Sequence, residues 1–120
     1  MTMRGKSFLL LCVAATSVAA LAQANTDPAM MPAPGPPTQE LVDKGRAQFE
    51  RTCAQCHGRN MVNSGTTSYD LRRFPTDEPD RFFKSVTHGK NNMPSFDGAL
   101  DPGALQWLWA YVSTRGGKEM

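Results

Sequence analysis

The sequence lacks a surplus of either charge and has few of the side chains that bind metals. Its 120 residues include 13 lysines and arginines against 11 acidic residues, with two histidines and three cysteines. So balanced a chain has no basic stripe, which removes the electrostatic basis for binding nucleic acid. It also lacks any run of alternating apolar and polar residues, so no strand is predicted. The length allows one small domain.

The first 24 residues have the features of a signal peptide. Basic residues precede an apolar run over 8–22, which ends in the small-x-small pattern Ala22-Gln23-Ala24. We expect residues 1–24 to be removed on export to the periplasm, and Cys12 to leave with them. The alternative is an uncleaved membrane anchor, for which the apolar run is short. After cleavage we expect no association with the membrane.

The mature chain is small and neutral. The signal takes two basic residues and no acidic ones, which leaves 11 of each sign. Residues 25–37 contain five prolines and predict an extended tether. Residues 38–117 then form the domain, and 118–120 a short tail. In a domain of about 80 residues, apolar burial alone gives only a small free energy of unfolding, so we expect a further source of stability.

Three helices are expected in the domain, and the predicted fold class is all-α. Thr38 can cap the first helix, because its hydroxyl accepts hydrogen bonds from the first turn. Gly89 stops the second, since glycine enters a left-handed cap without penalty. Asp101-Pro102 opens the third, because proline suits a first helical turn. The first and third helices are predicted over 38–53 and 101–116, with a loop at 58–75. The second is predicted to begin within Thr76–Pro79, which supplies a cap and an early proline, and to end at Gly89.

The first helix has a small residue between two large ones. Leu41, Gly45 and Phe49 recur every four residues and so share one face. Glycine inside a helix costs about 1 kcal/mol relative to alanine, and here it indicates that another helix crosses closely. The apolar faces of the other two helices are predicted from Phe82, Phe83 and Val86, and from Leu105, Leu108 and Val112.

The motif Cys53-Ala54-Gln55-Cys56-His57 has three possible interpretations. A structural zinc site needs four ligands, and His57 adjoins Cys56 too closely for easy closure with His88. A thioredoxin-like disulfide needs strands around it, and none is predicted. In a haem site each thiol forms a thioether to a vinyl group, while His57 binds the iron. Export favours the third interpretation, which gives one haem c per chain.

The second axial position of such an iron is often filled by a methionine sulfur. Most methionines lie in the signal, in the tether or at the terminus. Met61 follows His57 by four residues, a reach of at most about 14 Å, which is too short to go round the macrocycle. Met93 remains, in the loop after the second helix. His88 is the rival ligand, although a position at a helix C-terminus also suits a solvent-facing histidine.

Over residues 38–114 the chain resembles a class I c-type cytochrome. The residues that carry the resemblance are the Cys-x-x-Cys-His motif, Gly45 and Phe49 before it, Met93-Pro94-Ser95-Phe96, and the segment from Leu108 to Val112. It implies that Gly45 and Phe49 pack against Leu108 and Tyr111. Family members often orient the ligating histidine with the carbonyl of a following proline. No proline occurs here before Pro75, so we expect a carbonyl in the 60–66 loop to do this.

With both axial positions filled, the resemblance implies a one-electron carrier and not an enzyme. We expect a monomer that docks transiently with redox partners at the haem edge, near Cys53, Gln55 and residues 91–95. Candidate contacts for the haem propionates are Tyr69, Arg72, Arg73 and Trp107. A haem sensor or haem enzyme with a labile sixth ligand is one alternative, and a subunit fixed to a dehydrogenase is another. The loop Ser68–Pro75 also resembles small cytochromes of periplasmic quinoprotein alcohol dehydrogenases, which suggests a dehydrogenase as donor and a terminal oxidase as acceptor.

Overall fold

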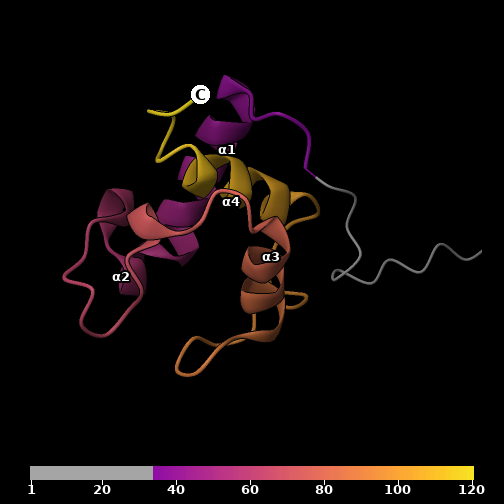
Figure 1. Ribbon diagram of the computed structural model, residues 1–120. Coiled ribbons are helices and arrows are strands. Elements are labelled where there is room, and N and C mark those ends of the chain that lie inside the picture. Colours follow the sequence, from indigo (N-terminus) through magenta and orange to yellow (C-terminus); the bar gives the residue numbers. More distant parts are fainter. Residues whose placement is uncertain (1–33) are drawn as a thin grey trace, which may run out of the picture.

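The computed structural model describes residues 34–120, and the predicted signal peptide and most of the predicted tether lie outside this range. Within it the chain is helical, which confirms the all-α prediction (Figure 1). The elements are α1 (Gln39–Thr52), α2 (Ala54–His57), the 3-10 turns η2 (Arg59–Met61) and η3 (Leu71–Arg73), α3 (Pro79–His88) and α4 (Ala104–Ser113). One isolated bridge, between Lys90 and Met93, is the extended pairing in this part of the chain. No helix there has both the length and the apolar character needed to cross a membrane.

Helices α1 and α4 cross at Gly45, as the sequence predicts (Figure 1). A Cβ atom at this position would lie 1.9 Å from the carbonyl oxygen of Trp107 and 2.7 Å from Cβ of Tyr111. The two backbones therefore approach to a distance that only glycine allows. One turn further on, the rings of Phe49 and Tyr111 pack with centroids 5.2 Å apart. Cys53 follows directly after the α1 side of this crossing.

The cap of α1 forms as predicted, and its buried face is wider than the predicted one. Thr38 Oγ1 accepts a hydrogen bond from the N–H of Leu41 at 3.3 Å. Val42 is fully buried, while Leu41 keeps partial exposure. Position 42 lies one residue round the helix from the predicted stripe, and Gly117 approaches it closely enough that a Cβ there would lie 3.2 Å from Val42. Val42 is buried because the turn at the C-terminus of the chain packs against α1. The spacing of apolar residues along α1 alone does not predict this contact.

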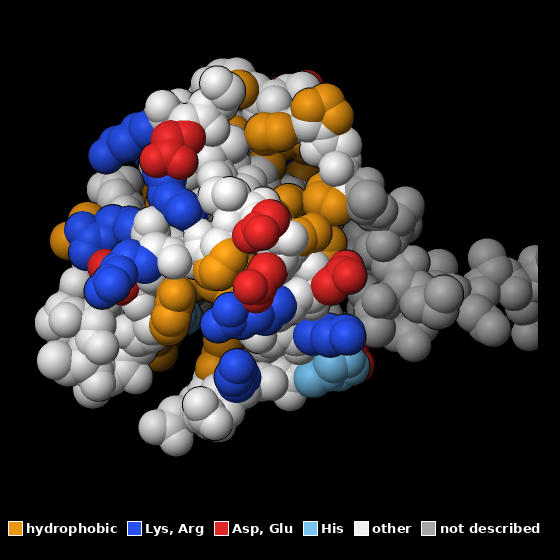
Figure 2. Space-filling view, viewed as in Figure 1, with side chains coloured by type: hydrophobic (Ala, Val, Ile, Leu, Met, Phe, Trp, Pro, Cys, Tyr) orange, Lys and Arg blue, Asp and Glu red, His pale blue; other side chains and the backbone are white. Residues whose placement is uncertain are grey.

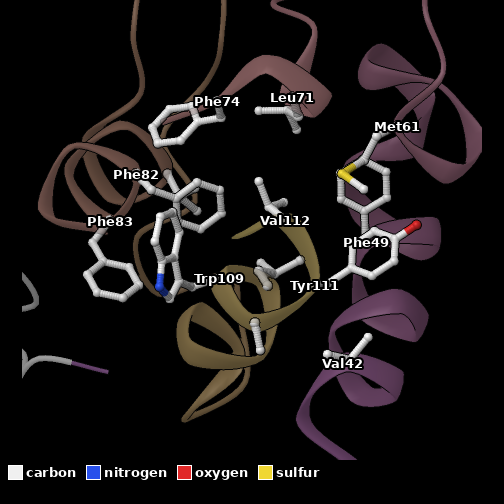
Figure 3. Packing of buried hydrophobic residues seen from close by; sticks show 13 residues of the cluster. Val42, Phe49, Met61, Leu71, Phe74, Phe82, Phe83, Trp109, Tyr111 and Val112 are labelled. Atoms are coloured by element: carbon white, nitrogen blue, oxygen red, sulfur yellow. The ribbon is translucent and has the colours of Figure 1, made fainter. Parts of the chain in front are cut away.

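The buried side chains form one core cluster, in which two groups of aromatic contacts can be followed (Figure 3). Phe49 and Tyr111 lie beside Met61 between α1 and α4, and Met61 is only 2% exposed. Trp109 of α4 packs against the rings of Phe82 and Phe83 in α3 and of Phe74, which directly follows the 3-10 turn η3. The ring centroids of this group lie 5.4 to 6.2 Å apart, in tilted or edge-on arrangements, and its members are Phe74, Phe82, Phe83 and Trp109.

Helix α3 begins at Pro79, within the predicted range Thr76–Pro79 and with the expected early proline, although Glu78 before it makes no side-chain cap. Helix α4 begins at Ala104 and not at Asp101-Pro102, because Gly103 has a left-handed φ of 84° and interrupts the turn before it. The predicted stop at Gly89 is confirmed, with a φ of 75°.

Candidate functional site

The Cys-x-x-Cys-His motif forms a tight turn at the end of α1. Cys53 ends α1, its N–H donating to the carbonyl of Phe49 at 2.8 Å, and it also precedes the one-turn helix α2, which was not predicted. The backbone N–H groups of Cys56 and His57 both donate to the carbonyl of Cys53, at 3.1 and 2.9 Å. Both thiols are free; Cys53 is half-buried and Cys56 is exposed. The turn thus presents two thiols and an imidazole from five consecutive residues.

His57 is oriented by a backbone carbonyl, although not by the expected one. Its Nδ1 lies 3.0 Å from the carbonyl oxygen of Tyr69. A carbonyl only accepts hydrogen bonds, so Nδ1 carries a proton, and in the neutral imidazole the lone pair of Nε2 is then free for a metal. The expectation of a carbonyl in the 60–66 loop is wrong. After His57 the chain first turns into the core at Met61, and it returns to the imidazole only at Tyr69.

Cys53 has the environment of an unreactive thiol. Its burial is the larger cause, and the neighbouring Cys56 the smaller one, of a pKa raised to about 11. A redox-active thiol needs a lowered pKa, since the thiolate is the reactive form. Moreover, no cluster of three or more histidine, cysteine or acidic side chains that could hold a metal ion occurs within residues 34–120. Thioether bonds require no stable thiolate in the folded protein, so these residues fit a covalently bound haem.

Met93 lies in a hairpin that is fastened to the end of α3. Lys90 and Met93 exchange backbone hydrogen bonds of 3.0 and 2.9 Å. Behind the hairpin, the N–H of Phe96 donates to the carbonyl of Val86 at 3.0 Å, and the Ser95 hydroxyl donates to the carbonyl of Thr87. A Cβ at Gly89 would lie 2.6 Å from the carbonyl oxygen of Met93. Backbone contacts therefore fix the position of Met93, whose half-buried side chain packs against the core.

The surface is hollowed between the loop that follows α2 and the hairpin that follows α3 (Figure 2). Hydrophobic side chains are visible within the hollow. Several apolar residues pack against the core while keeping part of their surface exposed: Cys53, Ala54, Met93, Phe96, Leu100 and Leu105. An apolar disc attached to Cys53 would cover such surface, as the haem interpretation requires.

The other predicted residues lie around the motif or further along the helices. Tyr69 is half exposed, and its hydroxyl donates to the carbonyl of Arg73 at 3.2 Å. Arg72 binds Asp70 through two contacts of 2.8 Å and lowers the pKa of that carboxyl, chiefly through the hydrogen bond. Trp107 lies by the first half of α1, with the Lys44 amino group 5.6 Å from its ring centroid. The rival ligand, His88, is the exposed last residue of α3.

Sequence reasoning did not single out Asn63, which contacts the motif. Its side-chain amide donates to the carbonyl of His57 at 3.0 Å, and its Oδ1 accepts from the N–H of Gly65 at 2.8 Å. An Asn-x-Gly sequence is a recognisable turn signal, because asparagine often bonds to the backbone two residues on. That signal predicts the turn, but the contact with His57 depends on the fold.

The fold and the site together define a class of protein. A small all-α domain with a Cys-x-x-Cys-His turn after its first helix, and a methionine hairpin before its last, is a class I c-type cytochrome. Residues 40–112 match the family described as cytochrome c oxidase, cbb3-type, subunit III. The chain belongs to this family of cytochrome c domains.

Several cytochromes c6 are similar to the chain. That of Limnospira maxima is 37% identical over 79 residues, which cover 59% of this chain and 89% of the relative. That of Nostoc sp. is 36% identical over 72 residues, covering 57% of this chain and 65% of the relative. A quinohemoprotein alcohol dehydrogenase, ADH IIB of Pseudomonas putida, is 30% identical over 88 residues, which make up 71% of this chain and 13% of that enzyme.

Family membership decides the cofactor and the kind of activity. Proteins of this class carry one covalently bound haem c, and so does this chain. It is an electron carrier and not an enzyme, and it acts together with redox partners. The predictions of class, cofactor and activity are therefore confirmed.

Proposed function

We propose that the protein is a periplasmic one-electron carrier whose haem c is attached to Cys53 and Cys56, with His57 and Met93 as the axial ligands of the iron. The observation that carries this proposal is the hydrogen bond from His57 Nδ1 to the carbonyl of Tyr69, because in the neutral imidazole it makes Nε2 the nitrogen with a free lone pair for a metal. The haem iron, when bound, accepts and releases a single electron. Periplasmic location is supported by the signal-like residues 1–24.

Met93 is the proposed second ligand because its position is fixed by backbone contacts. The Lys90–Met93 hairpin and the backbone bond from Phe96 to Val86 hold it, together with the bond from the Ser95 hydroxyl to the carbonyl of Thr87. Two ligands held in this way move little when the charge of the site changes, and a thioether favours the reduced state more than a second imidazole does. This arrangement suits repeated electron transfer without ligand exchange.

The surface around the motif suits brief contacts with partners. Gln55 and Cys56 are exposed on one side, and Asn91, Asn92 and Pro94 on the other. These residues carry no charge, and the residues after position 24 include equal numbers of acidic and basic side chains. Docking should therefore depend weakly on ionic strength, in contrast to an interface steered by one charged face. We propose that the protein acts as a monomer.

We propose that electrons arrive from a dehydrogenase, with a quinoprotein alcohol dehydrogenase as the first candidate, and leave towards a terminal oxidase. The similarity to part of a quinohemoprotein alcohol dehydrogenase supports this donor. Tyr69, Arg72, Arg73 and Trp107 are the proposed contacts of the propionates. The guanidinium group of Arg72 already donates hydrogen bonds to Asp70, so a propionate would compete with Asp70 for it.

Substitution of Met93 tests the ligand assignment. Met93→Ala should keep the covalent haem, lose the weak far-red band of ferric methionine ligation, and bind carbon monoxide in the reduced state. The matched control is Met61→Leu, because Met61 is buried in the core and Leu conserves its volume. This control should keep the wild-type spectrum. An unchanged spectrum in Met93→Ala would move the ligand elsewhere, with His88→Ala as the next variant to examine. Carbon monoxide binding by the wild type would instead favour a sensor or an enzyme.

A second candidate is a cytochrome subunit permanently fixed to a dehydrogenase. The similarity to a domain-sized part of a larger enzyme favours it. Gel filtration of a periplasmic extract, monitored at the haem absorption, separates the two. A free carrier elutes at the size of one small domain, whereas a fixed subunit elutes with its enzyme.

A further inference from the structure

The side chain of Asn63 joins three backbone segments beside His57. Its Nδ2 donates to the carbonyl oxygen of His57 at 3.0 Å and lies 3.4 Å from that of Tyr69, which is a longer and weaker contact. Its Oδ1 accepts from the N–H of Gly65 at 2.8 Å. Asn63 is half-buried, while the residues that follow it, 64–67, are exposed. A single amide thus ties an exposed loop to the last residue of α2.

The loop has little else to hold it there. Within residues 34–120, the hydrogen bonds between the loop 63–69 and α2 come from the Asn63 amide and from the imidazole of His57. The carbonyl of Tyr69 lies next to both, and its two lone pairs can accept both donors. Loss of the Asn63 contacts would leave the imidazole of His57 as the one hydrogen-bond donor to this carbonyl within residues 34–120.

We propose that Asn63 is a positioning residue for His57, which holds the Tyr69 carbonyl against Nδ1 and so sets the orientation and the donor strength of the imidazole. This inference rests on the proposed ligation of the haem iron by His57. A hydrogen bond from Nδ1–H raises the basicity of a ligating imidazole, and outer contacts of this kind tune a haem site. A more basic ligand stabilises the ferric state. Loosening the Tyr69 carbonyl should therefore raise the reduction potential and expose Nδ1–H to solvent.

The test compares the holoprotein with Asn63→Leu and with Ser64→Ala. Ser64 lies in the same loop but bonds only to Thr66, at 2.8 Å, and serves as the matched control. The measurements are the exchange rate of His57 Nδ1–H with solvent, by NMR of the reduced protein, and the midpoint potential. In Asn63→Leu we expect Nδ1–H to exchange about tenfold faster, because roughly one hydrogen bond is lost. We also expect a higher midpoint potential. Ser64→Ala should match the wild type in both.

A second variant separates the donor role from the turn. Asn63→Asp keeps an acceptor for the N–H of Gly65 but has no N–H to donate, so it should exchange as fast as Asn63→Leu. It also provides the comparison if Asn63→Leu fails to assemble. Exchange at the wild-type rate in either variant, with the His57 ring protons still shifted by the haem, overturns this inference alone. If these protons are unshifted in the wild type, the proposed ligation fails and the inference fails with it.

Discussion

Replacing Gly45 with alanine perturbs the crossing of α1 and α4 at its narrowest point. The added methyl would lie 1.9 Å from the carbonyl oxygen of Trp107 and 2.7 Å from Cβ of Tyr111. The helices must separate by 1.1 Å merely to restore a distance of 3.0 Å to that oxygen. Neither partner can rotate away, because one is backbone and the other is fixed to it.

Two opposing effects determine the size of the change. Overpacking of a rigid interior costs roughly 1–3 kcal/mol, and contacts with backbone belong at the upper end, about 3 kcal/mol. Alanine also gains about 1 kcal/mol over glycine in helix propensity. The free energy of unfolding should therefore fall by about 2 kcal/mol, which lowers the melting temperature of a domain of this size by about 8–16 °C. If the helices were well separated, the gain in helix propensity alone would raise the melting temperature.

The assay is thermal unfolding of the holoprotein, followed by far-ultraviolet circular dichroism and by the haem absorption. Gly35→Ala is the matched control, because a Cβ at Gly35 meets no atom within 4 Å. This control should remain within about 0.5 kcal/mol of the wild type. A Gly45→Ala variant as stable as the wild type, or more stable, would refute the close crossing.

Two further variants test how the Met93 hairpin is held. Gly89→Ala should destabilise the protein by roughly 1–3 kcal/mol and increase carbon monoxide binding to the reduced form, because its Cβ would meet the Met93 carbonyl oxygen at 2.6 Å. The control is Gly98→Ala, because Gly98 has a similar φ of 68° but open space around it. Equal stability and carbon monoxide binding in the two variants would contradict the reasoning. Ser95→Ala removes the hydroxyl that donates to the Thr87 carbonyl and should lower the melting temperature by about 4–8 °C for the loss of about 1 kcal/mol. An unchanged melting temperature would show that the Phe96–Val86 bond suffices to hold the loop.

Local signals in the sequence predicted the helices well. The Thr38 cap, the stop at Gly89 and the crossing at Gly45 each depend on one residue type in one conformation, and each is present. The start of α4 was predicted too early, since Asp101-Pro102 suits a helix N-terminus but Gly103 adopts a left-handed φ. The sequence does not show whether a glycine near a helix start adopts a helical or a left-handed conformation, so this boundary depends on packing.

The site could be predicted only in part, for a similar reason. The spacing of Cys53, Cys56 and His57 carries its own chemistry and needs no tertiary structure to be recognised. The partner of the imidazole does need it, because the Tyr69 carbonyl lies 12 residues away along a loop with no periodic pattern. Backbone carbonyls carry no sequence signal, so a search by residue type finds ligands but not the groups that orient them.

Main-chain hydrogen bonds contribute to the positions of both proposed ligands. His57 follows a turn closed on the carbonyl of Cys53, and Met93 closes a hairpin with Lys90. Main-chain bonds of this kind do not depend on the charge of a neighbouring group, whereas ion pairs near a redox centre would respond to it. The ion pair nearest the motif in sequence, Arg59 with Glu50, is long, at 3.7 Å, and its arginine is 88% exposed. Such pairs contribute little. A site held by its backbone can change oxidation state with little rearrangement, and this property is what electron transfer demands of the protein.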